Sequence, residues 1–153
     1  MNRILRGKAG LTIIEVLMSA VIIMVAVLGI VGLFPTALQN VYYGGHMSQG
    51  SSLAQEMIEL IRTQPFLTVI SYDGLDTRNA PGPRPASVLA HFTQWTNDIA
   101  PAIPAGALPQ GWGTITVGAV AGLPDLWQVT ITVGWRERGG QTITLVTYVA
   151  RYA

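Results

Sequence analysis

One long apolar run restricts the possible folds of this chain more than any other feature. Residues 16–34 read VLMSAVIIMVAVLGIVGLF, and Ser19 contributes the only polar side chain among these 19 positions. An α-helix of this length rises about 28 Å, which matches the thickness of the hydrocarbon core of a bilayer. We therefore predict a single membrane-spanning helix over about residues 11–34.

The charges around this run are distributed asymmetrically. Arg3, Arg6 and Lys8 precede it without any acidic residue among the first ten positions, and Glu15 is the only charged residue between Lys8 and Glu56. Lys and Arg are enriched at the cytoplasmic ends of membrane spans. The sequence therefore predicts a cytoplasmic N-terminus and an extracytoplasmic position for the rest of the chain.

The overall composition excludes several classes of protein. The chain has 153 residues, of which 50% are apolar and 11% charged, with a formal net charge of +1 and no cysteine. Intrinsic disorder requires low hydrophobicity and high net charge, and a nucleic-acid-binding domain requires a concentrated basic face. Without cysteine there is no disulfide, no thiolate nucleophile and no cysteine-based zinc site. The composition therefore predicts one small folded domain that does not bind nucleic acid.

Three interpretations of the N-terminus compete. The first is a plain membrane anchor. The second is a secretory signal cut after Ala37, although Pro35 would then occupy a position that requires a small residue, and the run is long for such a signal. The third depends on Glu15, because a carboxylate at mid-bilayer costs about 2.5–3.5 kcal/mol and a mere anchor has no reason to carry it.

The ten residues around Glu15 carry a family resemblance. The segment Lys8–Leu17, KAGLTIIEVL, resembles the class III signal of type IV prepilins and type II secretion pseudopilins. The resemblance implies that a prepilin peptidase cuts between Gly10 and Leu11 and methylates the new α-amine of Leu11. The chain departs from the family pattern in having Leu11 where Phe is commonest, and Ile13-Ile14 for Leu-Ile, and both changes keep the apolar character.

The same resemblance implies a role for Glu15 in assembly. In this family the carboxylate pairs with the amino terminus of a neighbouring subunit, and the pairing would relieve the cost of a charge in lipid. The implied partners are other pilin subunits, the prepilin peptidase, an inner-membrane assembly platform and, before assembly, membrane lipid. The chain would be stored in the bacterial inner membrane and then enter a pilus or pseudopilus filament.

The apolar run is expected to continue into a stem helix over about residues 36–64. Pro35 removes a backbone donor, so we expect a kink or a locally unwound stretch there. Ser51 or Ser52 could cap the later part of the stem, and Pro65 would end it. Apolar residues recur there at helical spacing and should pack on a sheet: Leu53, Met57, Ile58, Leu60 and Ile61.

The outer part of the chain, residues 65–153, is expected to form an extracytoplasmic head. Gly, Pro, Asp and Asn make residues 72–85 a surface loop, and Ser87 could cap a short amphipathic helix. Three strands are expected at about 113–120, 127–135 and 141–150, the last two joined by a hairpin turn at 136–140. With residues 1–10 as a leader and 11–64 as the long helix, the fold class is α+β, a pilin-like helix packed on a small antiparallel sheet of about three strands.

A second, looser resemblance lies in the head. The helix with Trp95, the turn at residues 108–113 and the strand at residues 129–136 are similar in order to minor pilins of the PilV type. Minor pseudopilins of type II secretion are closely alike and are the first alternative.

The head offers no evident catalytic or metal-binding constellation. His46 and His91 stand without a second ligand at metal-binding spacing, and we interpret both as structural or surface residues. Two further possibilities are an oxygen-rich calcium loop and a sugar- or surface-binding aromatic patch. The loop would use Asp73, Asp76 and Asn79, and the patch Trp112, Trp127 and Trp135. Turn formation and core packing are the plainer explanations.

Taken together, the residues and the two resemblances predict a minor pilin: a structural subunit of a type IV pilus-like filament, not an enzyme and without a cofactor or metal. The alternatives are a minor pseudopilin of type II secretion and, from a different class, a membrane-anchored extracytoplasmic enzyme or ligand-binding domain.

Overall fold

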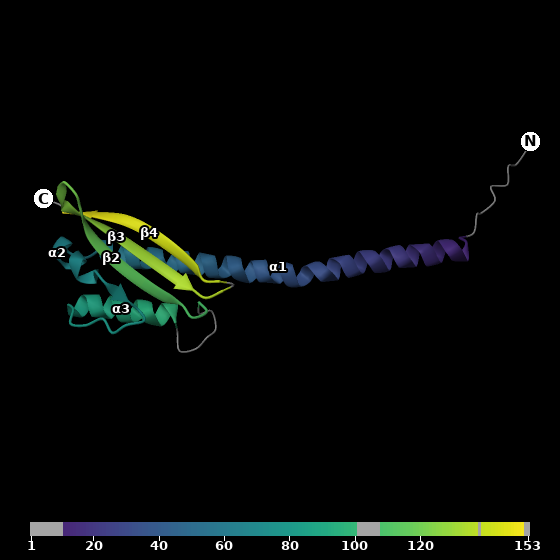
Figure 1. Cartoon of the computed structure of the whole chain (residues 1–153), viewed down its shortest axis with the longest axis horizontal. Helices are drawn as coiled ribbons and strands as arrows, with labels where there is room; N and C mark the ends of the chain where they lie inside the picture. Colours follow the sequence, from purple (N-terminus) through teal and green to yellow (C-terminus); the bar gives the residue numbers. More distant parts are fainter. Residues whose placement is uncertain (1–10, 101–107, 138, 152–153) are drawn as a thin grey trace, which may run out of the picture. The chain divides into compact units, whose positions relative to one another are not determined.

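The computed structural model describes residues 11–100, 108–137 and 139–151. Its elements are α1 (Ile13–Arg62), α2 (Phe66–Val69), the 3-10 turn η1 (Ile70–Tyr72), β1 (Leu75–Asp76), α3 (Ala86–Ile99), β2 (Trp112–Val120), β3 (Leu123–Trp135) and β4 (Gln141–Ala150) (Figure 1). The chain divides into two compact units, one ending at Tyr43 and the other beginning at Gly44. The α+β class and the long N-terminal helix are confirmed.

Helix α1 runs for 50 residues without interruption. Its backbone stays helical at Pro35 and through Gly44, Gly45 and Gly50. The locally unwound stretch considered at Pro35 is therefore absent from this structure, and neither Ser51 nor Ser52 caps a helix, because both lie inside α1. The apolar run before Pro35 and the helix-forming residues 53–62 after Gly50 support the helix through these weak positions.

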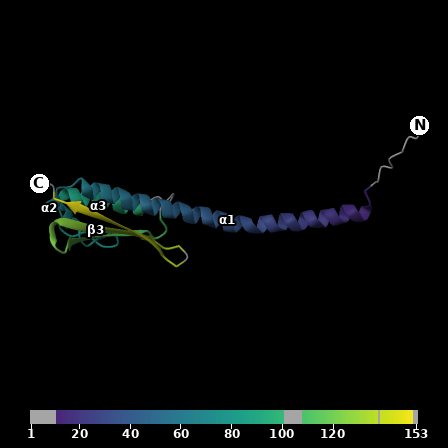
Figure 2. The ribbon, with the colours of Figure 1, turned by 90° about the horizontal axis from the view of Figure 1, so that it is seen from above.

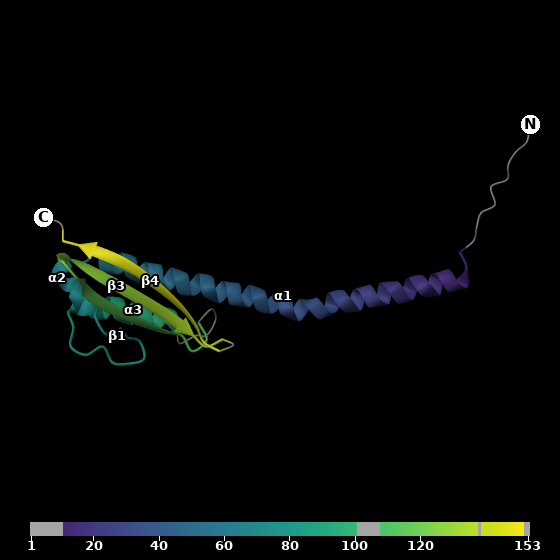
Figure 3. The same ribbon diagram turned by 45° about the horizontal axis from the view of Figure 1, so that its top comes forward.

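The sheet has four antiparallel strands in the order β1-β2-β3-β4, one more than the expected three. The additional strand β1 lies in the segment assigned to a surface loop, and Leu75 pairs with Ile115 at the edge of β2 (Figure 3). Leu75 is 1% exposed. Leu75 is buried although turn residues flank it, and its pairing with Ile115 makes this segment a short strand. The strand was not predicted because two residues are too few to show an alternating pattern.

Two tight turns order the three long strands. Ala121 and Gly122 join β2 to β3, with Gly122 at φ +79°, so β3 begins four residues before the expected position. The expected turn between β3 and β4 is confirmed, since Trp135 pairs with Gln141. Gly139 and Gly140 both have positive φ there, a conformation that glycine adopts without steric cost.

The core of the second unit lies between the helices and one face of the sheet. Figure 2 shows α3 beside the later part of α1, with the strands beneath them. The indole Nε1 of Trp95 in α3 donates a 3.0 Å hydrogen bond to the carbonyl of Leu53 in α1. The stem residues Leu53, Met57, Ile58 and Ile61 are buried, and Leu60 packs against the core, as their spacing predicted.

Helix α3 begins at Ala86, and its N-cap residue is Pro85, without a side-chain cap hydrogen bond. The expected cap by Ser87 is therefore wrong, because Ser87 is the second helical residue. Pro85 sets the entry instead, since its extended backbone (φ −54°, ψ 145°) precedes the first turn and the carbonyl of Pro85 accepts from the N–H of Leu89 at 3.0 Å. The apolar face of α3 is as expected, with Val88, Phe92, Trp95 and Ile99 buried.

Candidate functional site

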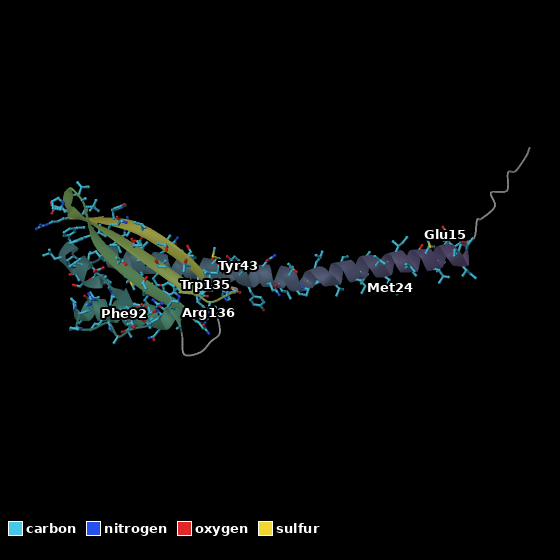
Figure 4. All side chains as sticks on the ribbon, in the orientation of Figure 1. Glu15, Met24, Tyr43, Phe92, Trp135 and Arg136 are labelled. Atoms are coloured by element: carbon cyan, nitrogen blue, oxygen red, sulfur yellow. The ribbon has the colours of Figure 1, made fainter. Side chains whose placement is uncertain are left out.

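The N-terminal turn of α1 holds the residues that the sequence singled out. Thr12 precedes the helix, and its Oγ1 accepts a hydrogen bond from the backbone N–H of Glu15 at 3.3 Å. Ser19 donates from its hydroxyl to the carbonyl of Glu15 at 2.8 Å. The Glu15 side chain itself is exposed and has no ion-pair partner among the described residues (Figure 4).

The cap at Thr12 is a feature that our sequence reasoning missed. Thr12-x-x-Glu15 immediately before an apolar run is the pattern of a capping box, in which the threonine hydroxyl satisfies one of the free N–H groups of the first turn. A negative side chain in that turn also interacts favourably with the helix dipole. Glu15 therefore has a local reason to stand at this position as well as any role in assembly.

The expected cleavage junction is only partly within the described residues. Gly10 lies outside them, whereas Leu11 is described, stands before the first helical residue and is 74% exposed. The exposed apolar surface begins at Leu11. All 17 large apolar side chains from there to Phe34 are between 51% and 81% exposed.

This surface makes α1 long and apolar enough to cross a membrane. None of the apolar stretch that meets this criterion is buried, and the described core residues begin at Leu53. Pro35 follows directly after the run, inside the continuous helix, and the kink expected there stays a prediction.

The two histidines join elements within the second unit. His46 Nδ1 in α1 lies 2.8 Å from Glu137 Oε2 in the turn after β3. His91 Nδ1 in α3 lies 2.6 Å from the Tyr72 hydroxyl. Burial raises the pKa of Tyr72 to about 12, so the phenol keeps its proton. Neither histidine belongs to a group of three or more metal-ligating side chains within the described part of the chain.

The residues considered for a calcium loop are engaged by protein donors. Asp73 Oδ1 accepts from the N–H of Val117 at 2.8 Å, which attaches the loop to β2. Asp76 accepts from Arg78 through both oxygens, at 2.9 Å from Nε and 2.7 Å from Nη2, and from Asn79 Nδ2 at 3.2 Å. The hydrogen bond from Arg78 holds the pKa of Asp76 below its ordinary value. These contacts account for the loop carboxylates as turn-forming groups.

The three tryptophans do not form one exposed patch. Trp135 is 1% exposed and belongs to the core. Trp127 is partly buried and stacks on Phe66, with ring centroids 5.7 Å apart. Trp112 lies on the opposite face of the sheet from the core, and the Cζ of Arg78 stands 4.5 Å from its ring centroid. Trp127 and Trp135 therefore contribute to core packing, which was the plainer of the two explanations expected for these rings.

Comparisons with protein-family models, with curated proteins and with solved structures gave no match.

Proposed function

We propose that this protein is a structural subunit, a minor pilin of a type IV pilus-like filament, assembled through its apolar N-terminal helix. One observation carries the proposal: an exposed apolar stretch of helix, residues 13–34, whose first turn contains the only charge between residues 9 and 55, shortly after a Gly-Leu junction.

The exposed helix requires an apolar surrounding. Seventeen large apolar side chains, each more than half exposed, would be unfavourable in water by roughly 25 cal/mol for each Å². Lipid satisfies this requirement in the membrane. The same surface would be satisfied by the helices of neighbouring subunits in a filament, so the helix can exchange one environment for the other at little cost.

In this proposal Glu15 makes the filament more favourable for the helix than the bilayer. In lipid the carboxylate is costly, and among the described residues it has no partner of opposite charge. Cleavage after Gly10 would create a cationic amine at Leu11. In our proposal, Glu15 of one subunit pairs with the Leu11 amine of the next, so that assembly relieves the cost of an unpaired charge and sets the axial register.

The processing steps follow from the resemblance of residues 8–17 to prepilin signals. A prepilin peptidase would act on the cytoplasmic side, where Arg3, Arg6 and Lys8 hold the leader. The product would stay anchored in the inner membrane, because the cut lies before the apolar run, until an assembly platform draws it into the filament.

Intact-mass and N-terminal peptide mass spectrometry of the protein from a host with a prepilin peptidase tests the proposal. We expect a chain that begins at Leu11 and carries one N-methyl group. The matched control is Gly10→Val, which places a side chain at the cut and should leave the precursor uncleaved. A native chain that retains Met1, or one cut near Ala37, would contradict the proposal.

A further inference from the structure

A cavity of about 510 Å³ lies within the second unit, where β2 begins and β3 ends. Its walls come from Arg78, Gln110, Trp112, Trp135 and Arg136, and from the two glycines of the β3–β4 turn. Figure 4 shows Trp135 and Arg136 next to each other at the end of β3. The volume is in the range of pockets that hold small ligands, about 300–1,000 Å³.

Arg78, one of the two arginines of the cavity, is held in place by other side chains of the protein. Asp76 fixes its Nε and Nη2, and the ring of Trp112 lies beneath its Cζ. Trp112 is fixed in turn, because it packs on Gly134, where an added Cβ would stand 2.4 Å from its Cε2 and Cζ2 atoms. The Nη1 of Arg78 makes no hydrogen bond to any described residue and remains available as a donor.

Arg136, the other arginine of the cavity, has more N–H groups without a hydrogen-bond acceptor among the described residues. Among the described residues, no carboxylate lies within 4.0 Å of the Arg136 guanidinium. Its side-chain contact is a long 3.5 Å bond from Nη1 to Gln110 Oε1. Its backbone is fixed, because its N–H donates to the carbonyl of Pro109 at 2.8 Å.

Two further observations mark this cavity as more than a surface hollow. Gln110 has φ +48°, and it is the one residue other than glycine with positive φ in the described part of the chain. Such strained backbone occurs preferentially at ligand sites. Trp135 is 1% exposed, and its indole Nε1, like that of Trp127 outside the cavity, is buried without a hydrogen-bond partner among the described residues. A buried N–H of this kind is usually satisfied by some acceptor.

We propose that this cavity binds a small ligand of about sugar size through a carboxylate or phosphate group. Guanidinium groups bind both oxyanions through paired N–H donors; Arg136 offers such a pair in its Nε and Nη2, and Arg78 adds its Nη1. Among the described residues, no carboxylate lines the cavity, and Arg136, which has no carboxylate partner there, gives it a positive charge. The amide of Gln110 and the ring of Trp112 suit the uncharged hydroxyls and carbons of the same ligand. The site lies wholly in the second unit and does not depend on filament assembly.

Tryptophan emission reports binding directly, because two of the four tryptophans line the cavity. The full chain in discs of neutral phosphatidylcholine would be titrated at 0.15 M salt with glucuronate, inorganic phosphate and, as the uncharged control, glucose. We expect a saturable change with glucuronate or phosphate at a Kd of about 1 mM or tighter, and none with glucose. The stronger of the two identifies the ligand as an acidic sugar or a phosphate compound.

Matched arginine variants separate a built site from general attraction of anions. Arg136→Ala should weaken binding about tenfold or more, and Arg136→Lys, which keeps the charge and loses the paired donors, should fall between. Arg151→Ala removes the same charge from an exposed arginine outside the cavity and should change nothing. Absence of saturation by either anion, equal binding of glucose, or an equal loss in Arg151→Ala would overturn the proposal.

Discussion

At the scale of single residues, Glu15 has a local role in the first turn of α1 and, in our proposal, an intermolecular one. Its backbone N–H is capped by Thr12, and its side chain stands exposed in the first turn, where the helix dipole favours a negative charge. These local effects contribute about 0.3–2 kcal/mol, whereas an unpaired charge deeper in a bilayer costs about 2.5–3.5 kcal/mol. Nearer the end of an apolar span the cost of a charge is smaller, so these local effects offset part of it, and the proposed pairing with Leu11 would relieve the rest.

Replacing Glu15 with Val separates the two roles. We expect Glu15→Val to insert into the membrane as well as the wild type, because it removes a charge from the span, but to be lost from purified filaments. Immunoblots of the membrane and sheared-filament fractions measure both. Ser19→Ala is the matched control, since it removes only the hydrogen bond to the Glu15 carbonyl. Filament levels of Glu15→Val equal to those of Ser19→Ala would refute the pairing with Leu11.

At the scale of elements, β2 and α3 meet so closely that a glycine is required. A Cβ at Gly113 would stand 2.3 Å from Trp95 Cη2 and 2.8 Å from Ile99 Cδ1, both in α3. At Gly118 on the same strand, a Cβ would meet nothing within 4 Å. The sequence shows two glycines in one strand, but only the packing of α3 distinguishes them.

This pair provides a prediction about packing. Gly113→Ala should lower the free energy of unfolding of the head by about 1–3 kcal/mol, because the Trp95 ring must move out of its place in the core. Gly118→Ala should be neutral or stabilising by up to about 1 kcal/mol, because alanine restricts the unfolded chain. Urea unfolding of the full chain in micelles, followed by near-ultraviolet circular dichroism, measures both. Equal effects of the two variants would show that α3 does not pack on Gly113.

The elements differ in how well their sequence predicted them. Strand β4 alternates in period two between clear turn residues, and its expected and observed bounds agree. The face of α3 followed from its spacing, but its start did not, because Ser87 and Pro85 both satisfy the rules for the first turn. Strand β1 exists only through its pairing with β2, and no local pattern in two residues can predict such pairing.

At the scale of the whole molecule, the chain consists of a unit without a core and a unit with one. Every buried apolar side chain among the described residues lies between Leu53 and Val149. Residues 13–43 form one continuous helical stretch, and the large apolar side chains along it are exposed. The first unit therefore depends on its surroundings, and the second has the contacts needed to fold by itself.

A fragment of residues 44–153 tests this division. We expect it to be soluble without detergent and to unfold cooperatively, because it keeps all the described core contacts and loses the exposed apolar run. Thermal unfolding followed by far- and near-ultraviolet circular dichroism measures the transition. The full chain in micelles is the reference for the near-ultraviolet spectrum of Trp95 and Trp135. A fragment that lacks a near-ultraviolet signal would show that the head needs the first unit to fold.

The amino-acid sequence by itself determined the apolar helix, the α+β class, the stem face and the β3–β4 hairpin, because each depends on the periodicity or composition of a continuous segment. It also predicted the prepilin-like junction at Gly10 and Leu11, with Glu15 one turn later. Only the tertiary structure decided that β1 joins the sheet, that Gly113 admits Trp95, and that Arg78 and Arg136 line one cavity with Trp112 and Trp135. These features join residues that are distant in the chain, and long-range contacts of this kind leave no local pattern in any of the segments that make them.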